Sequence, residues 1–265
     1  MIRLVALDLD DTLLNSQLAI SPETAASIKR AMEKGVTVTL ATGRMYRSAL
    51  PFALELGLDV PLVTYHGALV KTSRSKEVIC DWPVPLGPAR DVVRLAKEFG
   101  FDINLYVDDE LYAGTGHRYI NAYVNLAKVP YRQVPDLLDV LHKEPHKILL
   151  IGEEEKLDEF DAVLRKQFPG QLHIAKSKPY FLEITSAAGT KGHALDELTR
   201  NMGISQQEVM AVGDSYNDLE MLEFAGTGVA MGNARPEIQA KADFVTLSNE
   251  ENGVAAAINK FVLNN

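Results

Sequence analysis

The sequence predicts an α/β protein with a doubly wound parallel sheet and a second, inserted α+β part. Two observations lead to this prediction. Short apolar runs alternate with helical stretches near both ends of the chain, and the middle of the chain breaks that alternation. Strands that alternate with helices are typical of a parallel sheet covered by helices on both faces. With 265 residues, of which 46% are hydrophobic, the chain is long enough to form two cores.

The first part of the chain has the order strand, helix, strand, helix, strand. Ser21-Pro22-Glu23 is typical of a helix start, and Gly35 of a helix end. This order predicts a doubly wound, Rossmann-like sheet. The expected elements are strands at 4–7, 36–41 and 60–64, helices at 22–34 and around 49–56, and a hairpin within 69–79.

The character of the chain changes at 82–88, where Pro83, Pro85, Pro88 and Gly87 exclude a helix interior or a central strand. Strands in unequal pairs between helices follow, which favours an α+β insert with a mostly antiparallel sheet. The elements expected in the insert are helices at 89–99, 119–126, 136–142 and 154–168, and strands at 103–107, 111–113, 147–151, 172–175 and 181–185.

The first pattern resumes at Gly189. The expected elements are helices at 191–202, up to 224, after 236 and at 251–261, and strands at 209–212, 228–231 and 244–246. We therefore expect a core made of residues 1–81 and 188–265, with an inserted domain at 82–187.

Charge and cysteine content limit the possible partners and compartments. The formal net charge of −9 disfavours a nucleic acid or an anionic membrane as the main partner. Cys80 is the only cysteine, so no internal disulfide is expected. The sequence shows no signal peptide and no apolar run of about 20 residues. We expect a cytoplasmic protein and a monomer.

Four short polar motifs lie at predicted strand ends or helix starts. They are Asp8-x-Asp10-x-Thr12, Thr42-Gly43-Arg44, Thr190-Lys191-Gly192 and Gly213-Asp214-x-x-Asn217-Asp218. In a parallel sheet such positions can converge at one edge. Carboxylates without histidine or cysteine partners suit a hard cation such as Mg²⁺, whereas a threonine hydroxyl, glycine amides and a lysine suit a phosphate. Aspartate nucleophiles that form an aspartyl phosphate are a known solution for phosphoryl transfer.

Each motif also has a purely structural interpretation. The stretch from Asp8 to Asp10 could be a solvated acidic turn, and Thr42-Gly43 a strand-to-helix turn. Lys191 could be a solvated lysine, although a cation at a helix start opposes the helix dipole. The remaining polar residues with open interpretations are Arg44, which could contact substrate or only solvent, Asp218, which could be a helix-start acid, and Asp11, which we interpret as a turn residue.

Taken together, the forms DLDDTLL, ATGR, TKG and GDxxND resemble the haloacid dehalogenase superfamily, and in particular its Cof-type phosphatases. The resemblance covers essentially the whole chain, with a large insert between the third strand and the lysine motif. It implies a catalytic core with a cap domain, and Mg²⁺-dependent hydrolysis of small phosphorylated metabolites, sugar phosphates foremost.

The resemblance also implies a role for individual residues. Asp8 would attack phosphorus and become the aspartyl phosphate, and Asp10 would protonate the leaving group and then activate water. The groups implied to hold Mg²⁺ are the Asp8 side chain, the Asp10 backbone carbonyl and Asp214, with Asp218 supporting the metal's waters. The groups implied to hold the phosphate are the Leu9 amide, Thr42, the Gly43 amide, Lys191 and Asn217.

One position departs from the family pattern. Cof-type sequences usually read Asn-Gly-Ala after the third strand, and this chain reads His66-Gly67-Ala68. The change puts substrate preference in doubt, while catalysis should survive because the four motifs are intact. Alternatively, His66 only hydrogen-bonds a neighbouring loop.

The substrate contacts of the cap and the reaction class stay open. The turns at 114–117 and 176–180 could contact substrate, although Lys176 and Lys178 could equally be solvated. Tyr119, Tyr123 and Leu126 are expected to lie in the core of the cap. A phosphomutase or other phosphotransferase with the same intermediate, or a non-catalytic regulator that binds phosphometabolites, remains an alternative function.

Overall fold

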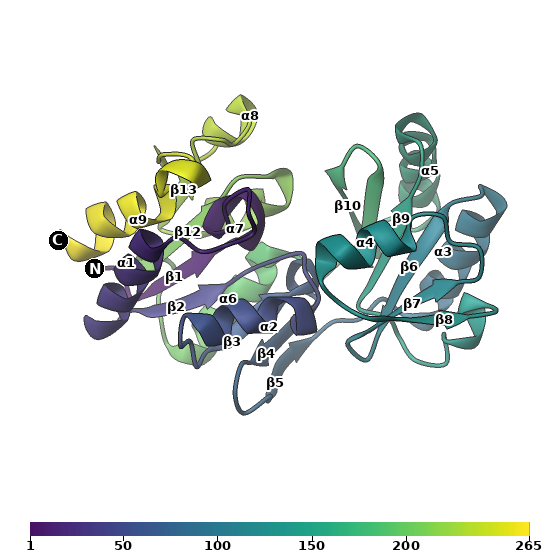
Figure 1. Ribbon diagram of the computed structural model, residues 1–265, viewed down its shortest axis with the longest axis horizontal. Coiled ribbons are helices and arrows are strands. Elements are labelled where there is room, and N and C mark those ends of the chain that lie inside the picture. The colour runs from purple at the N-terminus through teal and green to yellow at the C-terminus, as the bar shows by residue number, and fades with distance from the viewer. Residues whose placement is uncertain (265) are drawn as a thin grey trace.

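A five-stranded parallel sheet forms the centre of the lobe that carries both ends of the described chain (Figure 1). The computed structural model describes residues 1–264. The strands, in spatial order, are β14 (Phe244–Val245), β13 (Thr227–Ala230), β12 (Val209–Gly213), β1 (Leu4–Leu7) and β2 (Thr37–Leu40). Every neighbouring pair is parallel, which confirms the predicted fold class.

Helices cover both faces of this sheet. The central strand β1 is buried throughout: Val5 and Leu7 pack on one face, and Leu4 and Ala6 on the other. The helices on the face of Val5 are α1 (Pro22–Glu33), α2 (Tyr46–Glu55) and α9 (Gly253–Ile258). Those on the face of Leu4 are α6 (Lys191–Met202), α7 (Leu219–Phe224) and α8 (Pro236–Gln239). The predicted polar motifs follow β1, β2 and β12 or begin α6.

A small antiparallel sheet extends the parallel one at the β2 edge. It consists of β3 (Pro61–Thr64), β4 (Leu69–Thr72) and β5 (Val78–Asp81). An isolated parallel bridge between Ala41 and Val63 joins it to the chain that leaves β2. The carboxyl end of β3 therefore lies beside the Thr42-Gly43-Arg44 motif.

The second lobe is built on a six-stranded sheet in the order β10-β11-β9-β6-β7-β8. Neighbours are antiparallel except β7 and β8. The strands are β6 (Asp102–Val107), β7 (Glu110–Gly114), β8 (Tyr131–Val134), β9 (Lys147–Ile151), β10 (Leu172–Lys178) and β11 (Phe181–Ser186). One face packs on α3 (Leu86–Glu98) and α5 (Glu154–Gln167). The other face carries α4 (Ile120–Ala127) and shares an apolar cluster with the first lobe.

Two predictions of local structure in this lobe are wrong. The helix expected at 136–142 is one turn of 3-10 helix, Leu137–Asp139, and the preceding segment forms the unpredicted edge strand β8. Strand β10 runs to Lys178, beyond its predicted end at residue 175, because it pairs with β11 as far as Lys178 and Phe181. In both cases pairing with another strand decides the structure, and the residue pattern of the segment alone does not show that pairing.

The turn after β3 has an unusual backbone. Tyr65, His66 and Gly67 have consecutive positive φ angles of 52°, 61° and 115°. The first two are non-glycine residues, for which this conformation is unfavourable by about 1–2 kcal/mol each. Glycine is required at 67, because a Cβ there would lie 2.1 Å from the backbone oxygen of Thr190.

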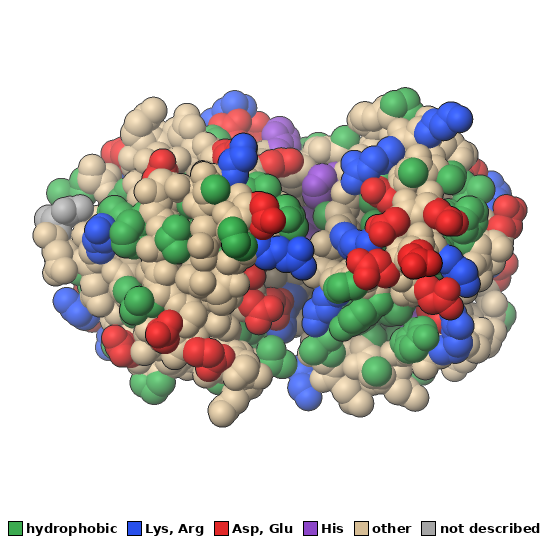
Figure 2. Space-filling model, turned by 90° about the horizontal axis from the view of Figure 1, so that it is seen from above, with side chains coloured by type: hydrophobic (Ala, Val, Ile, Leu, Met, Phe, Trp, Pro, Cys, Tyr) green, Lys and Arg blue, Asp and Glu red, His purple; other side chains and the backbone are tan. Residues whose placement is uncertain are grey.

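The two lobes meet along a groove whose walls carry histidine and charged side chains (Figure 2). Among residues 1–264, no helix combines the length and apolar composition needed to cross a membrane.

We expect Gly67→Ala to destabilise the protein far more than Gly57→Ala. Both glycines have positive φ, but a Cβ at Gly57 meets nothing within 4 Å. Gly57→Ala should therefore be destabilised only by the backbone strain of alanine at positive φ, about 1–2 kcal/mol. At Gly67 the methyl group must also displace the backbone of Thr190. Urea unfolding of both variants measures the difference, and equal losses would contradict the close contact.

Candidate active site

A buried lysine joins two carboxylates at the carboxyl end of the parallel sheet. Lys191, the first residue of α6, is fully buried, and its Nζ donates hydrogen bonds of 2.6 Å to Asp8 Oδ1 and to Asp218 Oδ1. Burial disfavours the charged lysine, but Asp218 and Asp8 outweigh it and raise the pKa of Lys191 above its usual value. The lysine is therefore a permanent cation at this site.

The other oxygen of Asp218 holds the loop after β12. Asp218 Oδ2 accepts hydrogen bonds from the backbone amides of Asp214 (3.0 Å) and Ser215 (2.9 Å). Both of its oxygens are thus occupied by protein donors. Asp218 consequently shapes the loop and pairs with Lys191.

Asp8 and Asp214 are better placed to bind a cation. One oxygen from each of Asp8, Asp214 and Asp218 lies within 4.8 Å of the others. Thr12 Oγ1 donates a hydrogen bond of 2.9 Å to Asp214 Oδ1, which fixes that carboxylate and was not anticipated from the sequence. In the described part of the chain, the second oxygens of Asp8 and Asp214 accept no hydrogen bond from the protein. Such free carboxylate oxygens fit a hard divalent ion.

Burial makes this group of carboxylates unfavourable without a cation. It raises the pKa of Asp8 well above its usual range, and the nearby charges of Asp218 and Asp214 add to the effect, while Lys191 opposes it. Burial and then Asp218 raise the pKa of Asp214 to about 7. Additional positive charge between Asp8 and Asp214 would lower both pKa values.

Asp10 is more exposed than this buried group and pairs with Arg44. The Arg44 guanidinium donates two hydrogen bonds, from Nε to Asp10 Oδ2 (2.8 Å) and from Nη2 to Asp10 Oδ1 (2.6 Å). The Arg44 side chain is 13% exposed and that of Asp10 is 48% exposed. The interpretation of Arg44 as a solvated arginine is therefore wrong, because it orients a carboxylate of the site.

Apart from Lys191, the residues expected to hold phosphate lie on the loops after β1, β2 and β12. Leu9 and Thr42 are buried, and Thr42 Oγ1 accepts a hydrogen bond of 3.1 Å from the Arg44 amide. Gly43 packs against the ring of His66, since a Cβ on Gly43 would lie 2.4 Å from His66 Cε1. Asn217 Nδ2 lies 3.2 Å from His66 Nδ1. His66 thus connects the loops of Gly43 and Asn217.

Two charged residues of the second lobe also reach this region, and the sequence analysis missed both. Lys147 Nζ donates hydrogen bonds to the Gly43 carbonyl (2.7 Å) and to Glu183 Oε2 (2.6 Å). Both side chains are buried, in the strands KILLI and FLEITS. A charged residue inside an apolar strand is rarely buried without a partner, so these two runs contained a signal.

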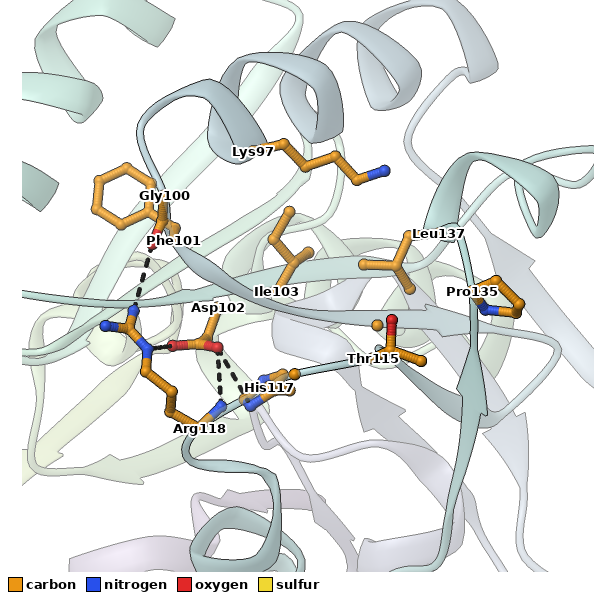
Figure 3. Close-up of a pocket in the computed structure, with 12 residues that line it drawn as sticks. Lys97, Gly100, Phe101, Asp102, Ile103, Thr115, His117, Arg118, Pro135 and Leu137 are labelled. Carbon is orange, nitrogen blue, oxygen red and sulfur yellow. Dashed lines mark hydrogen bonds and ion pairs between the residues drawn. The ribbon is translucent and has the colours of Figure 1, made fainter.

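The two turns considered for substrate contact lie in the second lobe, and nothing in their contacts decides that role. Lys176 pairs with Asp158 and Glu154 of α5. The 114–117 turn lines a pocket of about 310 Å³ beside the ion pair of Asp102 and Arg118, as Figure 3 shows.

The aromatic face of α4 is only partly buried. Tyr119 and Leu126 are 46% and 42% exposed, so their expected place in the core of the lobe is wrong. Together with Tyr123 they line an apolar pocket of about 360 Å³. Tyr123 packs against the cluster shared by both lobes, and its hydroxyl contacts that of Tyr106.

This geometry, a carboxylate paired with a buried lysine beside two further carboxylates, fits a hydrolase of the phosphoryl-transfer type. The family model of the haloacid dehalogenase-like hydrolases matches residues 5–258, and the chain belongs to this family.

Individual relatives agree in sequence and in structure. A Bacillus subtilis protein named 5-amino-6-(5-phospho-D-ribitylamino)uracil phosphatase YwtE is 33% identical over 97% of each chain. A Serratia proteamaculans protein named HMP-PP phosphatase is 32% identical over 91% of this chain and 87% of its own. The crystal structure of a haloacid dehalogenase-like hydrolase from Bacteroides thetaiotaomicron superposes with a TM-score of 0.90, at 33% identity over 98% of this chain and 99% of that one. The family and the enzyme class predicted from the sequence, a phosphatase of this family, are confirmed.

We expect Asp214→Asn to stabilise the Mg²⁺-free protein at about pH 8 by about 2 °C or more in unfolding temperature. The pKa of Asp214 is raised to about 7 in the folded chain, so the folded state binds more protons than the unfolded state between about pH 4 and this value. Stability is therefore lost as the pH rises through that range. Asparagine carries no charge and avoids this loss of stability. Thermal unfolding of the wild-type chain and of Asp214→Asn at about pH 5 and about pH 8 measures the difference.

Asp11→Asn is the matched control, because Asp11 is an exposed carboxylate of the same region. Millimolar Mg²⁺ should stabilise the wild-type chain and Asp11→Asn, and it should not stabilise Asp214→Asn. An equal stabilisation of all three proteins by Mg²⁺ would contradict the assignment of Asp214 to the cation site.

Proposed function

We propose that this enzyme is a Mg²⁺-dependent phosphatase that hydrolyses small phosphorylated metabolites, sugar phosphates foremost, through an aspartyl phosphate on Asp8. The observation that carries the proposal is the Asp8 carboxylate, bonded through one oxygen to the buried Lys191 and close to Asp214. We further propose that residues 1–81 and 188–265 form the catalytic core and that residues 82–187 act as its cap.

In the first half-reaction, one carboxylate oxygen of Asp8 attacks phosphorus. A bond forms between this oxygen and phosphorus, and the bond from phosphorus to the leaving oxygen breaks. Asp10 gives its proton to that leaving oxygen, so an alcohol departs. Lys191 lowers the repulsion between the Asp8 carboxylate and the phosphoryl oxygens. The Leu9 and Gly43 amides, Thr42 and Asn217 complete the proposed set of phosphate ligands.

In the second half-reaction, Asp10 acts as the base. It takes a proton from water, whose oxygen attacks the phosphorus of the aspartyl phosphate. The bond from Asp8 to phosphorus breaks, which releases inorganic phosphate and restores both carboxyl groups. Arg44 donates two hydrogen bonds to the Asp10 carboxylate and keeps it in one orientation.

Mg²⁺ fits the donor set of Asp8, Asp214 and the Asp10 backbone carbonyl, which consists of oxygens alone. When bound there, it would supply positive charge that brings a carboxylate and a phosphate dianion together. Asp218 would act behind these ligands through its bonds to Lys191 and to the Asp214 amide.

The class of substrate is supported by the relatives and by charge. The name of the Bacillus subtilis relative describes a uracil with a phosphorylated ribityl chain, which is a small phosphorylated metabolite. The net charge of −9 disfavours a nucleic acid or an anionic membrane as partner. We propose a monomer, and the single cysteine favours the cytoplasm as its compartment.

Asp8→Asn should lower kcat for p-nitrophenyl phosphate by about a thousandfold or more, since the amide is a poor nucleophile. Removal of Mg²⁺ with EDTA should abolish the wild-type activity, and added Mg²⁺ should restore it. Asp11→Asn, again the control, should keep the wild-type rate. Mg²⁺-dependent activity in purified Asp8→Asn would refute the role of Asp8.

Product analysis and binding measurements with a sugar phosphate separate the alternative functions. Release of inorganic phosphate from a sugar phosphate, without formation of an isomeric sugar phosphate, is expected of a phosphatase. Net isomerisation would indicate a mutase. Binding of phosphorylated sugars without turnover would indicate a regulator.

A further inference from the structure

A buried ion pair of the second lobe contacts the proposed phosphate site directly. Glu183 on β11 and Lys147 on β9 are bonded to each other at 2.6 Å, and their side chains are 8% and 5% exposed. Lys147 also donates to the carbonyl of Gly43, in the first lobe. Burial alone would raise the pKa of Glu183, but Lys147 and His66 outweigh it and lower that pKa below its usual value. The pair is therefore ionised.

His66 continues this contact to the loop after β12. Its Nε2 lies 2.9 Å from Glu183 Oε2, and its Nδ1 lies 3.2 Å from Asn217 Nδ2. Asn217 Oδ1 accepts a hydrogen bond from Ser215 Oγ, so its Nδ2 is the donor toward the ring. A neutral imidazole that donates from Nε2 to Glu183 and accepts at Nδ1 from Asn217 satisfies both contacts. Burial lowers the pKa of His66 and favours this neutral form.

The turn that carries His66 touches three of the four motifs. The amides of Tyr65 and His66 donate to the carbonyls of Arg44 (2.9 Å) and Thr42 (3.0 Å). Gly67 lies against the backbone of Thr190, next to Lys191. The Tyr65 hydroxyl donates to Asp109 Oδ1 of the second lobe at 2.7 Å. The strained 65–67 turn is therefore held between the motifs on one side and carboxylates of the second lobe on the other.

We propose that His66, Glu183 and Lys147 are positioning residues that couple docking of the second lobe to the phosphate site. Glu183 orients His66, which holds the Asn217 side chain, and Lys147 holds the peptide of Gly43. This inference rests on the proposed function, because Asn217 and the Gly43 amide are its phosphate ligands. It adds that these ligands are held in place from the second lobe.

The three residues act on the phosphoryl group rather than on the leaving group. Loss of the network should therefore lower kcat/KM for all phosphorylated substrates by a similar factor. It should also weaken the binding of inorganic phosphate and vanadate, which have no leaving group. A direct contact with the rest of the substrate would instead give a loss that depends on the substrate.

The main variant is the double substitution Lys147→Met with Glu183→Gln, which leaves no unpaired buried charge. His66→Gly is the second variant, because glycine tolerates the positive φ at this position and has no side chain to make either contact. The matched control is Lys156→Met with Glu153→Gln, which removes an exposed lysine–glutamate pair of the same lobe.

We expect both variants to lower kcat/KM by about tenfold or more, the equivalent of at least one lost hydrogen bond. The loss should be the same for p-nitrophenyl phosphate and glucose 6-phosphate. The inhibition constant of vanadate should rise by a similar factor, and the control should match the wild-type chain. Thermal unfolding with and without inorganic phosphate, in the presence of Mg²⁺, gives a second measure of phosphate binding.

Two results would overturn the inference. One is a lower unfolding temperature with unchanged affinity for phosphate and vanadate, which would show that the network only stabilises the fold. The other is a loss confined to one substrate, which would show contact with the leaving group. If the wild-type chain binds phosphate without hydrolysing p-nitrophenyl phosphate, the proposed function fails, and the phosphate-binding measurement still decides the inference.

Discussion

The ion pairs of Lys191 are the interaction on which the rest of the site depends. Two carboxylates from opposite ends of the chain, Asp8 and Asp218, are buried together, and this is tolerable only because a lysine lies between them. The lysine in turn has a fixed place because α6 begins with it. Strand β1 and the loop after β12 must therefore meet the start of α6 within hydrogen-bond distance. The parallel pairing of β1 with β12 provides this geometry.

The sequence predicted those parts of the fold and site that depend on local patterns. Apolar runs such as 4–7 and 209–212 identified strands, and the polar residues that follow them could be placed at one sheet edge by the rule for parallel sheets. The edge strand β8 was missed because its residues alternate weakly and pair only with β7. The contact of Arg44 with Asp10 and the buried pair of Lys147 and Glu183 were missed because they join segments that only tertiary packing brings together.

The 65–67 turn shows how backbone strain and docking are related. Three consecutive residues with positive φ are unfavourable in isolation. The turn persists because its amides bond to the Thr42 and Arg44 carbonyls and because Tyr65 and His66 bond to carboxylates of the second lobe. Part of the energy that maintains the turn therefore comes from contact between the lobes. A change in the contact between the lobes would therefore alter the stability of this turn.

The two catalytic candidates, Asp8 and Asp10, differ in their exposure to solvent. The Asp8 side chain is 7% exposed and lies against Lys191, whereas that of Asp10 is 48% exposed and is held by Arg44. Attack on phosphorus needs a fixed, dry environment, since the charges that offset each other are strongest there. Transfer of a proton to the leaving group needs access to whatever group the substrate carries. The buried surroundings of Asp8 can therefore stay the same in enzymes with different substrates, while the exposed surroundings of Asp10 differ. This agrees with relatives of similar sequence that are named for different substrates.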